Sequence, residues 1–520
     1  MTTKGERIEI RLLKDEYWWG GIVRHGERMP FGAHENIRLS MCPNLDGNQG
    51  APLLVSSKGR YVWSEKPYSF EFKDGALILD DLLGTIEQGK GHGTLKGAYL
   101  AACQKYFPPT GKMPHELSFL APQYNAWIDM LRFPTQEKVM GYAKAILDAG
   151  VPPGVLMIDD YWYIYNGLWK WDREAFPNPK EMVDRLHKMG FVVALWVSPF
   201  ITCDTRTFMD LREKDWVVKR LHDTQKPGDK PLPAIFRWWH GWSSMIDLSN
   251  PKAFAWFQGE LDELVEKYGI DGFKFDGGDP WQHRLTDVSF TPQTPNDHCT
   301  DFARLGLKYS IAEYRACWKL GGTHLIQRVR DKAHKWGDGG LADLIPSGLA
   351  QGLLGFPYSC PDMVGGGEDN DFVDGWVFEQ DLFIRWAQVS TFFPIIQYSR
   401  LPNRVLDAKH LELCMKMVDL RVKLGPEVLE LAKHAARTGE PIMRHMAYEF
   451  PNEGMERVLN QYMLGSKYLV APVMTKNAES RRVRFPRGKW RGDDGSIVEG
   501  SCEVEVSAPL ARLPWYTRMG

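Results

Sequence analysis

The segment Ile270–Pro280, with the sequence IDGFKFDGGDP, constrains the fold more than any other stretch of the chain. A short apolar run of β-forming residues ends there in acids, glycines and a proline. This pattern predicts a buried parallel strand with Asp276 at its C-terminal end. The preceding segment predicts a helix, because Asn250 can cap it, Pro251 suits its first turn and Gly269 can end it. A helix that leads into a buried strand is half of a βαβ unit.

The predicted position of Asp276, at the C-terminal end of a strand, is where parallel α/β folds form their active sites. In these folds the active site forms where the C-terminal ends of the strands meet the following loops. Asp276 is therefore either an active-site residue or an acid that only caps the next turn. This segment alone leaves both interpretations open.

Composition narrows the class of protein. A chain of 520 residues, 43% of them hydrophobic, is long enough for two or three domains. The 64 lysines and arginines nearly balance the 66 aspartates and glutamates, which argues against nucleic acid or an anionic membrane as a partner. The first residues contain no apolar core of signal-peptide length and no run approaches a membrane span, so we expect a soluble, cytoplasmic protein. The 20 tryptophans and 19 tyrosines suggest a carbohydrate ligand, because aromatic faces stack on the C–H faces of sugars.

The pattern of secondary structure changes twice along the chain. Residues 1–115 hold short alternating runs between turns, such as Tyr68 to Phe72, which predicts an N-terminal β-sandwich domain. Residues 116–446 repeat strand, loop and helix, which predicts an α/β fold, a (β/α)8 TIM barrel with an inserted loop at Trp216 to Trp242. Residues 447–520 return to short β runs and predict a small C-terminal β-sandwich domain.

Eight candidate barrel strands are short apolar runs that alternate with helical segments. They are Phe119 to Asn125, Val155 to Asp160, Phe191 to Ser198, Ser244 to Leu248, Gly272 to Asp276, Leu325 to Val329, Phe356 to Asp362 and Ile395 to Ser399.

Carboxylates and tryptophans gather at the predicted strand ends. These candidate site residues are Trp127, Asp159, Asp160, Trp196, Trp239, Asp276 and Asp362. No histidine pair suited to a transition metal and no Gly-rich nucleotide loop accompanies them, so we expect no metal and no cofactor. Two chemistries fit such a site: glycoside cleavage by paired carboxylates, and carboxylate-bound Mg²⁺ acting on an enolisable acid. The abundance of tryptophan favours glycoside cleavage.

Several motifs resemble glycoside hydrolase family 31, and they occur in the order that this family shows. They are Gly272 to Asp276 (GFKFD), Glu16 to Gly21 (EYWWGG), Pro122 to Trp127 (PQYNAW), Met157 to Asp160 (MIDD), Leu195 to Phe200 (LWVSPF), Pro361 to Gly366 (PDMVGG) and Arg385 to Gln388 (RWAQ). The chain is most similar to the α-galactosidase-like branch of the family.

The resemblance implies that Asp276 is the catalytic nucleophile. An ionised carboxylate at this position attacks the anomeric carbon and forms a glycosyl-enzyme. Lys274, two residues earlier, points to the same side of the strand, where its charge helps to keep Asp276 ionised. The alternatives are that Lys274 is only a counter-ion and that Asp279, which precedes a proline and suits a turn, is the nucleophile.

The resemblance also implies the acid/base residue, although the usual Gly-Asp-Asn signature of the family is absent. The branch pattern Asp-Lys-x-x-x-Trp-Gly, followed by Leu-Ile-Pro, matches Asp331 to Gly337 and Leu344 to Pro346, so we assign Asp331. The alternative is Asp338, which lies in a Gly-rich turn where aspartate is common for local reasons.

The remaining site residues are expected to bind the sugar. The spacing of Arg315 before Asp331 matches the substrate-binding arginine of the family, and Asp159 and Asp160 match a pair that binds hydroxyls far from the scissile bond. The other residues expected to line the sugar site are Trp127, Trp196, Trp239, Lys274 and Asp362. For each tryptophan, packing in the core is the alternative.

The expected function is therefore that of a retaining, exo-acting glycosidase that cleaves terminal α-linked galactosides through a covalent glycosyl-enzyme. The alternatives are α-glucosidase, sulfoquinovosidase or α-N-acetylgalactosaminidase activity, or a non-catalytic sugar-binding relative. The expected partner is a small carbohydrate, with neither nucleic acid nor membrane, and the sequence leaves homo-oligomerisation open.

Overall fold

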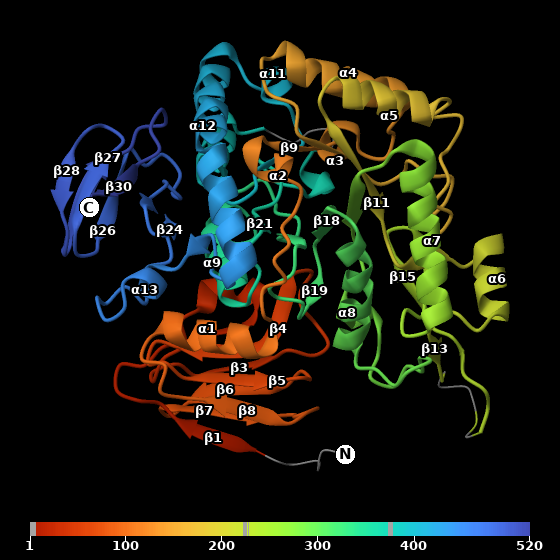
Figure 1. The fold of residues 1–520 in the computed structure, drawn as a ribbon, viewed down its shortest axis with the longest axis horizontal. Helices are drawn as coiled ribbons and strands as arrows, with labels where there is room; N and C mark the ends of the chain where they lie inside the picture. Colours follow the sequence, from red (N-terminus) through yellow and green to blue (C-terminus); the bar gives the residue numbers. More distant parts are fainter. Residues whose placement is uncertain (1–6, 222–225, 227, 373–377, 520) are drawn as a thin grey trace.

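A parallel β-barrel forms the centre of the protein in the computed structural model, which describes residues 7–221, 226, 228–372 and 378–519 (Figure 1). Its strands are β9 (Gln123–Asn125), β10 (Val155–Ile158), β11 (Val192–Val197), β17 (Gly272–Phe275), β18 (Ile311–Tyr314), β20 (Ile326–Arg328), β21 (Ser359–Cys360) and β22 (Gln397–Tyr398). All neighbours pair in parallel, in the order β21-β20-β18-β17-β11-β10-β9-β22. A parallel bridge between Met363 and Gln397 joins the two ends, so the predicted eight-stranded barrel is confirmed.

One predicted barrel strand, Ser244 to Leu248, is wrong. The chain there forms β16 (Gly241–Met245), which pairs antiparallel with β12 (Phe200–Thr202) and β15 (Ile235–Trp238) outside the barrel. The strand that the sequence did not reveal is β18, which lies between β17 and β20. Its four residues include the fully buried Glu313, and this charged side chain hides the apolar pattern of a barrel strand.

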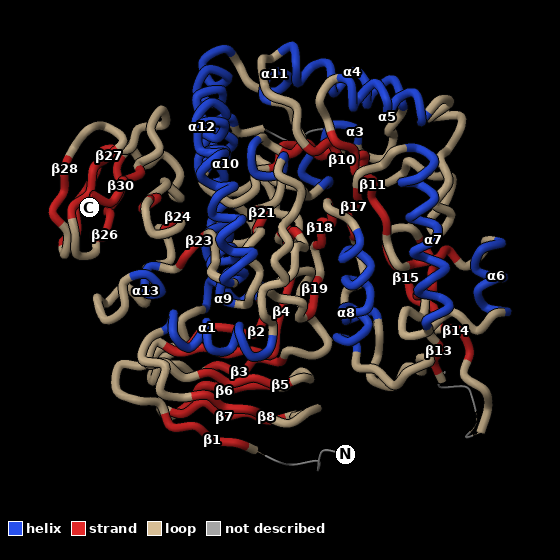
Figure 2. The backbone as a smooth tube through the Cα atoms, in the orientation of Figure 1, coloured by secondary structure: helices blue, strands red, loops and turns tan. Residues whose placement is uncertain are grey.

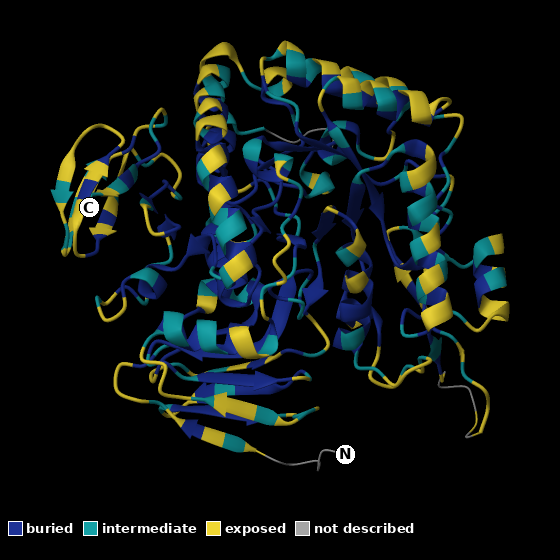
Figure 3. Cartoon of the chain, in the orientation of Figure 1, coloured by how far each residue is buried: buried dark blue, intermediate teal, exposed yellow. Residues whose placement is uncertain are grey.

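The helix before β17 forms as its end signals predict. Helix α7 (Pro251–Tyr268) follows Asn250, whose side chain accepts a hydrogen bond from the backbone N–H of Lys252. Gly269 ends the helix with a left-handed backbone, at a φ of 78° that favours glycine. The buried face of α7 packs on the barrel, and Figure 3 shows the strands buried and the outer helix surfaces exposed.

Helices surround the barrel (Figure 2). They are α4 (Gln136–Asp148), α5 (Pro179–Lys188), α7, α8 (Pro295–Leu305), α9 (Leu344–Leu353), α10 (Gln380–Thr391) and α12 (Ala408–Thr438). In the described part of the chain, no helix is both long enough and apolar enough to span a membrane.

The N-terminal part packs two antiparallel sheets below the barrel (Figure 1). The first sheet has the order β1 (Ile8–Arg11), β7 (Ala76–Asp80), β6 (Ser69–Lys73) and β3 (Ile37–Ser40). The second contains β4 (Gln49–Ser56), β5 (Tyr61–Ser64) and β8 (Ile86–Gly89), with β2 (Trp18–Ile22) beside β4. The barrel segment β19 (Cys317–Trp318) joins this sheet in parallel with β4, which ties the N-terminal part to the loop after β18.

The C-terminal part is a six-stranded sheet with a two-stranded ribbon. The sheet has the order β23 (Met443–Arg444), β24 (Tyr462–Leu464), β25 (Tyr468–Val470), β30 (Trp515–Met519), β27 (Lys489–Gly492) and β28 (Ile497–Glu499). The ribbon pairs β26 (Ser480–Phe485) with β29 (Cys502–Ser507). The side chain of Arg385 in α10 donates to the carbonyl oxygen of Ala508 at 2.7 Å and so attaches this part to the barrel.

Candidate active site

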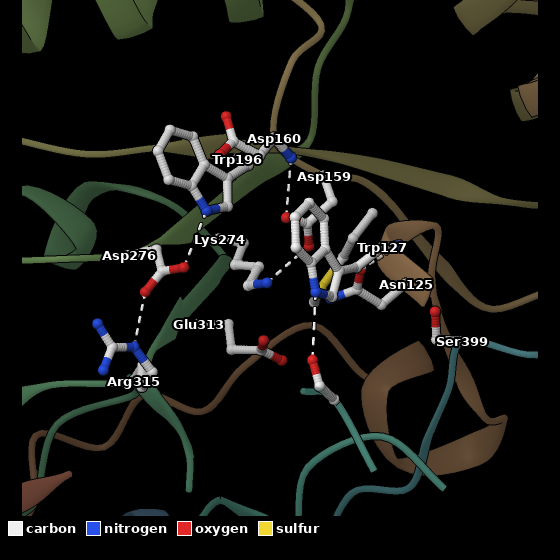
Figure 4. A network of polar contacts seen from close by, with 12 residues as sticks. Asn125, Trp127, Asp159, Asp160, Trp196, Lys274, Asp276, Glu313, Arg315 and Ser399 are labelled. Carbon is white, nitrogen blue, oxygen red and sulfur yellow. Dashed lines mark hydrogen bonds and ion pairs between the residues drawn. The ribbon is translucent and has the colours of Figure 1, made fainter. Parts of the chain in front are cut away.

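Asp276 follows β17 directly and lies at the C-terminal end of the barrel, between Trp196 and Arg315 (Figure 4). Trp196 Nε1 donates to Asp276 Oδ2 at 3.0 Å, and Arg315 Nε donates to Oδ1 at 2.7 Å. The backbone N–H of Gly277 donates to Oδ1 at 2.8 Å. Burial by itself raises the pKa of Asp276, but the charges of Arg315, Lys274 and Arg328 outweigh it and hold this pKa well below its ordinary range. The carboxylate is therefore kept ionised, as a nucleophile must be.

Lys274 acts on Asp276 through space, because its own ion pair is with Asp159. Lys274 Nζ lies 2.6 Å from Asp159 Oδ2, and both side chains are buried. Trp196, Lys274 and Glu313 are register partners on adjacent strands, so their side chains point to the same side of the barrel wall (Figure 4). Lys274 is thus the counter-ion of Asp159 and a source of positive potential at Asp276.

Asp160 accepts hydrogen bonds from three side chains. Trp239 Nε1 donates to Asp160 Oδ2 at 3.2 Å, and His240 Nε2 lies 2.7 Å from the same oxygen. The hydroxyl of Tyr163 donates to Oδ1. Sequence reasoning found Trp239 but missed His240 and Tyr163. The available signals were the position of His240 next to Trp239 and that of Tyr163 three residues after Asp160.

Arg315 joins the carboxylates of Asp276 and Asp279. Its NH2 donates to Asp279 Oδ2 at 2.8 Å while its Nε binds Asp276. Burial raises the pKa of Asp279, and the charge of Asp276 raises it further, against the opposing effect of Arg315. Asp279 precedes the short helix that begins at Pro280, in the turn that the sequence predicted.

Asp331 follows β20 and lines the same cavity as Asp276. Its side chain is 34% exposed, and its Oδ1 accepts a hydrogen bond from Arg328 NH1 at 2.7 Å. Asp338 lies in an exposed turn and does not line the cavity that Asp331 lines. Asp362 does not line this cavity either. It is fully buried and binds Arg328 NH1 at 2.6 Å, so a direct contact with sugar, as the sequence led us to expect, does not fit its position.

The cavity has a volume of about 380 Å³ and contains nearly all of the predicted site residues. The predicted residues that line it are Trp127, Asp159, Asp160, Trp196, Trp239, Lys274, Asp276, Arg315 and Asp331. Sequence reasoning missed the lining residues Arg132, Tyr161, Gly367, Glu368, Asp369 and Asn370. Most of these belong to the loop after β21, which has no periodic pattern. Trp127 Nε1 donates to the carbonyl oxygen of Gly367 at 3.2 Å and fixes this loop (Figure 4).

A second cavity of about 350 Å³ adjoins the first and shares Trp239, Arg315, Asp331 and Glu368 with it. The outer cavity is also lined by Trp281, by Arg330 and by the N-terminal segment from Asn44 to Gly47. Asp331 therefore stands at the junction between the two cavities. Across the residues that the structure describes, no group of three or more His, Cys, Asp or Glu side chains is arranged to hold a metal ion.

Several known proteins resemble the chain in sequence. The myogenesis-regulating glycosidase of Mus musculus is 32% identical over 422 residues, which cover 78% of this chain and 57% of that protein. The alpha-xylosidase XylQ of Lactiplantibacillus pentosus is 27% identical, with 88% of this chain and 61% of that protein covered. Alpha-glucosidase 2 of Bacillus thermoamyloliquefaciens is 25% identical, with 80% and 54% covered. The chain thus spans somewhat more than half of the length of these three relatives.

Solved structures share the fold. A GH31 dextranase of Flavobacterium johnsoniae in complex with glucose superposes with a TM-score of 0.85 at 19% identity, covering 99% of this chain and 66% of that chain. A GH31 sulfoquinovosidase from E. rectale superposes with a TM-score of 0.82 at 18% identity, covering 99% and 82%.

The family models cover most of the chain. The model of the glycosyl hydrolases family 31 TIM-barrel domain matches residues 113–430, and that of the family 31 C-terminal domain matches residues 439–520. The matched barrel contains both Asp276 and Asp331, which line one cavity. On this evidence the chain belongs to glycoside hydrolase family 31.

Proposed function

We propose that the protein is a retaining, exo-acting glycoside hydrolase that cleaves terminal α-galactosides. The observation that carries the proposal is the ionised Asp276 carboxylate, bound by Trp196 and Arg315, in a cavity that also contains the partly exposed Asp331. Retaining glycosidases need such a pair, one carboxylate as nucleophile and one carboxylic acid to protonate the leaving oxygen.

The first step forms a covalent bond between enzyme and sugar. An oxygen of Asp276 attacks the anomeric carbon, and the bond from that carbon to the leaving oxygen breaks. Asp331 transfers its proton to this oxygen, so the aglycone leaves as an alcohol. The outer cavity holds the leaving group in this arrangement, because it opens from the inner cavity at Asp331.

The second step releases the sugar with its configuration retained. Asp331, now a carboxylate, takes a proton from water, and the resulting nucleophile attacks the anomeric carbon. The bond to Asp276 breaks and its carboxylate is regenerated, while Asp331 is protonated again for the next cycle.

In this proposal the glycone occupies the inner cavity, where Asp159 and Asp160 bind its hydroxyls, as the family resemblance implies. Both acids are almost fully buried and each is oriented by a basic or hydrogen-bonding partner, Lys274 for Asp159 and His240 for Asp160. Oriented carboxylates of this kind accept hydrogen bonds from sugar hydroxyls. A cavity of about 380 Å³ lined by these buried acids suits a terminal sugar and supports exo action.

The preference for galactose rests on the similarity to the α-galactosidase-like branch. Relatives that carry the names alpha-xylosidase and alpha-glucosidase make these glycones the alternatives within the family, together with sulfoquinovose and N-acetylgalactosamine. The alternative from a different class is a sugar-binding protein without catalysis.

A panel of nitrophenyl α-glycosides tests the proposal. We expect the highest kcat/KM on the α-galactoside and, by proton NMR, release of α-galactose as the first product. A higher kcat/KM on the glucoside, xyloside or N-acetylgalactosaminide would reject the glycone, and release of β-galactose would reject retention. Sugar binding in calorimetry without turnover of any substrate would favour the non-catalytic alternative.

A further inference from the structure

The side chain of Gln49 reaches from β4 of the N-terminal part to the ends of two barrel strands. Its Nε2 donates to the backbone carbonyl oxygen of Arg315 at 2.6 Å and to that of Arg328 at 2.7 Å. An amide nitrogen carries two N–H groups, which is enough for both of these contacts. Gln49 is fully buried, and its Oε1 accepts a hydrogen bond from Nε2 of Gln351 in α9 at 2.8 Å. The amide of Gln49 is therefore fixed at both its oxygen and its nitrogen.

The two carbonyl groups lie where the pairing of β18 with β20 ends. The last pair in the register of these parallel strands is Tyr314 with Gln327, and Arg315 and Arg328 are the next residues. Gln49 supplies donors to the carbonyl groups of both arginines at this point. A buried carbonyl group that loses its donor costs free energy, so the amide of Gln49 stabilises one particular spacing of the two strand ends.

Each of these arginines holds one of the two proposed catalytic acids. Arg315 Nε donates to Asp276 Oδ1 at 2.7 Å, and Arg328 NH1 donates to Asp331 Oδ1 at 2.7 Å. Gln49 is therefore linked to both acids through the backbone and the guanidinium of one arginine each. A retaining glycosidase needs its two carboxyl groups about 5–5.5 Å apart, and a shift of about 1 Å in an active site can cost about 100-fold in rate.

The residues before Gln49 contact the same two segments of the barrel. A Cβ atom added at Gly47 would lie 2.5 Å from Arg315 NH1, so the glycine leaves room for the guanidinium. The φ of Gly47 is 70°, in the left-handed region that favours glycine. Asn48 Oδ1 accepts a hydrogen bond from the backbone N–H of Arg330, which precedes the proposed acid/base residue, at 2.9 Å. Three consecutive residues of the N-terminal part thus contact the segments that carry the catalytic acids or their partners.

Building on the proposed function, we propose that Gln49 and Gly47 are positioning residues that set the separation of Asp276 and Asp331. Gln49 acts through the backbones of the two arginines, and Gly47 acts through the space that it leaves for one guanidinium. The N-terminal part then belongs to the catalytic unit. If Gln49 only joined the N-terminal part to the barrel, its loss would lower stability and leave the arrangement of the acids unchanged.

The first test replaces Gln49 with methionine, which has a similar size and no amide. We expect kcat/KM on an α-galactosyl disaccharide to fall about 100-fold, because its cleavage needs both acids in place at once. The loss on α-galactosyl fluoride should be smaller, because formation of the glycosyl-enzyme from it needs Asp276 and no proton from Asp331. The inhibition constant for galactose should change far less than kcat/KM, because Gln49 does not line the inner cavity.

Gln388→Met is the matched control for stability. Gln388 in α10 is also buried, and its Nε2 donates to the carbonyl oxygen of Leu510 at 2.6 Å, which ties the C-terminal part to the barrel. Its replacement should lower Tm to an extent similar to Gln49→Met. It should leave kcat/KM on both substrates unchanged, since neither arginine is involved.

The second test is Gly47→Ala, with Gly75→Ala as its matched control. The added methyl group displaces the Arg315 guanidinium, which lowers the pKa of Asp276. The pKa of Asp276 then rises, so we expect the acidic limb of the kcat/KM profile to move to higher pH. Gly75, in the turn between β6 and β7, has a φ of 69°, and a Cβ added there meets no atom of the described chain within 4 Å. Gly75→Ala therefore brings similar backbone strain without the contact and should leave the limb in place.

The inference is wrong if Gln49→Met keeps the parent kcat/KM on the disaccharide, or if Gln388→Met loses as much. It is also wrong if Gln49→Met loses both substrates and galactose binding equally, or if Gly47→Ala and Gly75→Ala have the same acidic limb. The two tests change different contacts, so a folding defect in one variant leaves the other decisive. Failure of the proposed function gives a different result: the parent protein then cleaves no glycoside of the panel, or Asp276→Ala stays active. If the panel favours another glycone, the variants are compared on the disaccharide and fluoride of that sugar.

Discussion

Arg315 Nε donates to Asp276 Oδ1 at 2.7 Å, while NH2 of the same guanidinium binds Asp279. The arginine that the sequence assigned to substrate binding is thus a direct partner of Asp276, the proposed nucleophile. It orients the carboxylate and contributes the largest favourable charge that lowers its pKa. This relationship leads to the first prediction.

Replacing Arg315 with glutamine should raise the pKa of Asp276, because burial is then opposed by fewer positive charges. The nucleophile loses activity when protonated, so we expect the acidic limb of the kcat/KM profile to move to higher pH, with a loss of about tenfold or more at the original limb. Arg404→Ala, at an ion pair with Asp129 outside the cavity, is the control and should leave the limb unchanged. An acidic limb that does not move in Arg315→Gln would contradict this role.

The dependence of the rate on the leaving group distinguishes Asp331 from Asp338 as the acid/base residue. Asp331→Ala should nearly abolish cleavage of an α-galactosyl disaccharide but keep partial turnover of a dinitrophenyl glycoside or the fluoride, since activated leaving groups need little protonation. Azide should restore part of the rate by replacing water on the glycosyl-enzyme. Asp338→Ala, in an exposed turn, should cause a smaller loss that is similar for both substrates. The reverse pattern would move the acid/base assignment to Asp338.

His240 orients Asp160 and should affect binding of the glycone more than chemistry. His240→Ala removes the contact of 2.7 Å with Asp160, and loss of a hydrogen bond to a charged group costs about 1.5–3 kcal/mol. We expect KM and the inhibition constant for galactose to rise about tenfold or more, in line with that cost. His434→Ala, at an ion pair with Glu440 outside the cavity, serves as the control. A fall in kcat with unchanged galactose inhibition would contradict the role.

Activity should survive chelation. The carboxylates of the cavity are already engaged by side chains of the protein, Asp276 by Arg315, Asp159 by Lys274 and Asp160 by His240. We expect kcat/KM to be the same before and after dialysis against EDTA. Loss of activity that added Mg²⁺ restores would favour the carboxylate-bound metal chemistry that the sequence left open.

Stability should decline as the solution becomes acidic. Burial lowers the pKa of His298 and of His445 to about 3 each, below the ordinary value near 6.5. The unfolded chain therefore binds more protons than the folded chain between these values, so the free energy of unfolding falls as pH drops from about 6.5 to 3. Calorimetry should show a lower Tm at pH 4.5 than at pH 7.

The His298→Leu variant should show a smaller fall of Tm over the same range, because it removes one group that must lose a proton on folding. His34→Leu, on the surface, is the matched control and should keep the parent slope. A Tm that rises on acidification would show that other groups dominate.

Local sequence signals determined the helices, strands and motifs that are formed by residues close together in the chain. Asn250, Pro251 and Gly269 act within one turn of chain, so the helix before β17 forms as predicted. The strand that follows could be predicted for the same reason, since Phe273 and Phe275 lie within four consecutive residues. The motifs around Asp276, Asp159 and Trp196 predicted the family and most of the lining of the inner cavity.

Tertiary structure alone decided which strands pair in one sheet and which charged side chains interact. Gly241–Met245 and Ile311–Tyr314 are both short runs, and only pairing with distant strands placed the second in the barrel and the first outside it. The partnership of Arg328 with Glu313 and Asp362 joins three barrel strands or their ends. Its physical basis is desolvation and Coulomb interaction between groups brought together by the closed barrel, and neither acts on residues that are far apart in an extended chain.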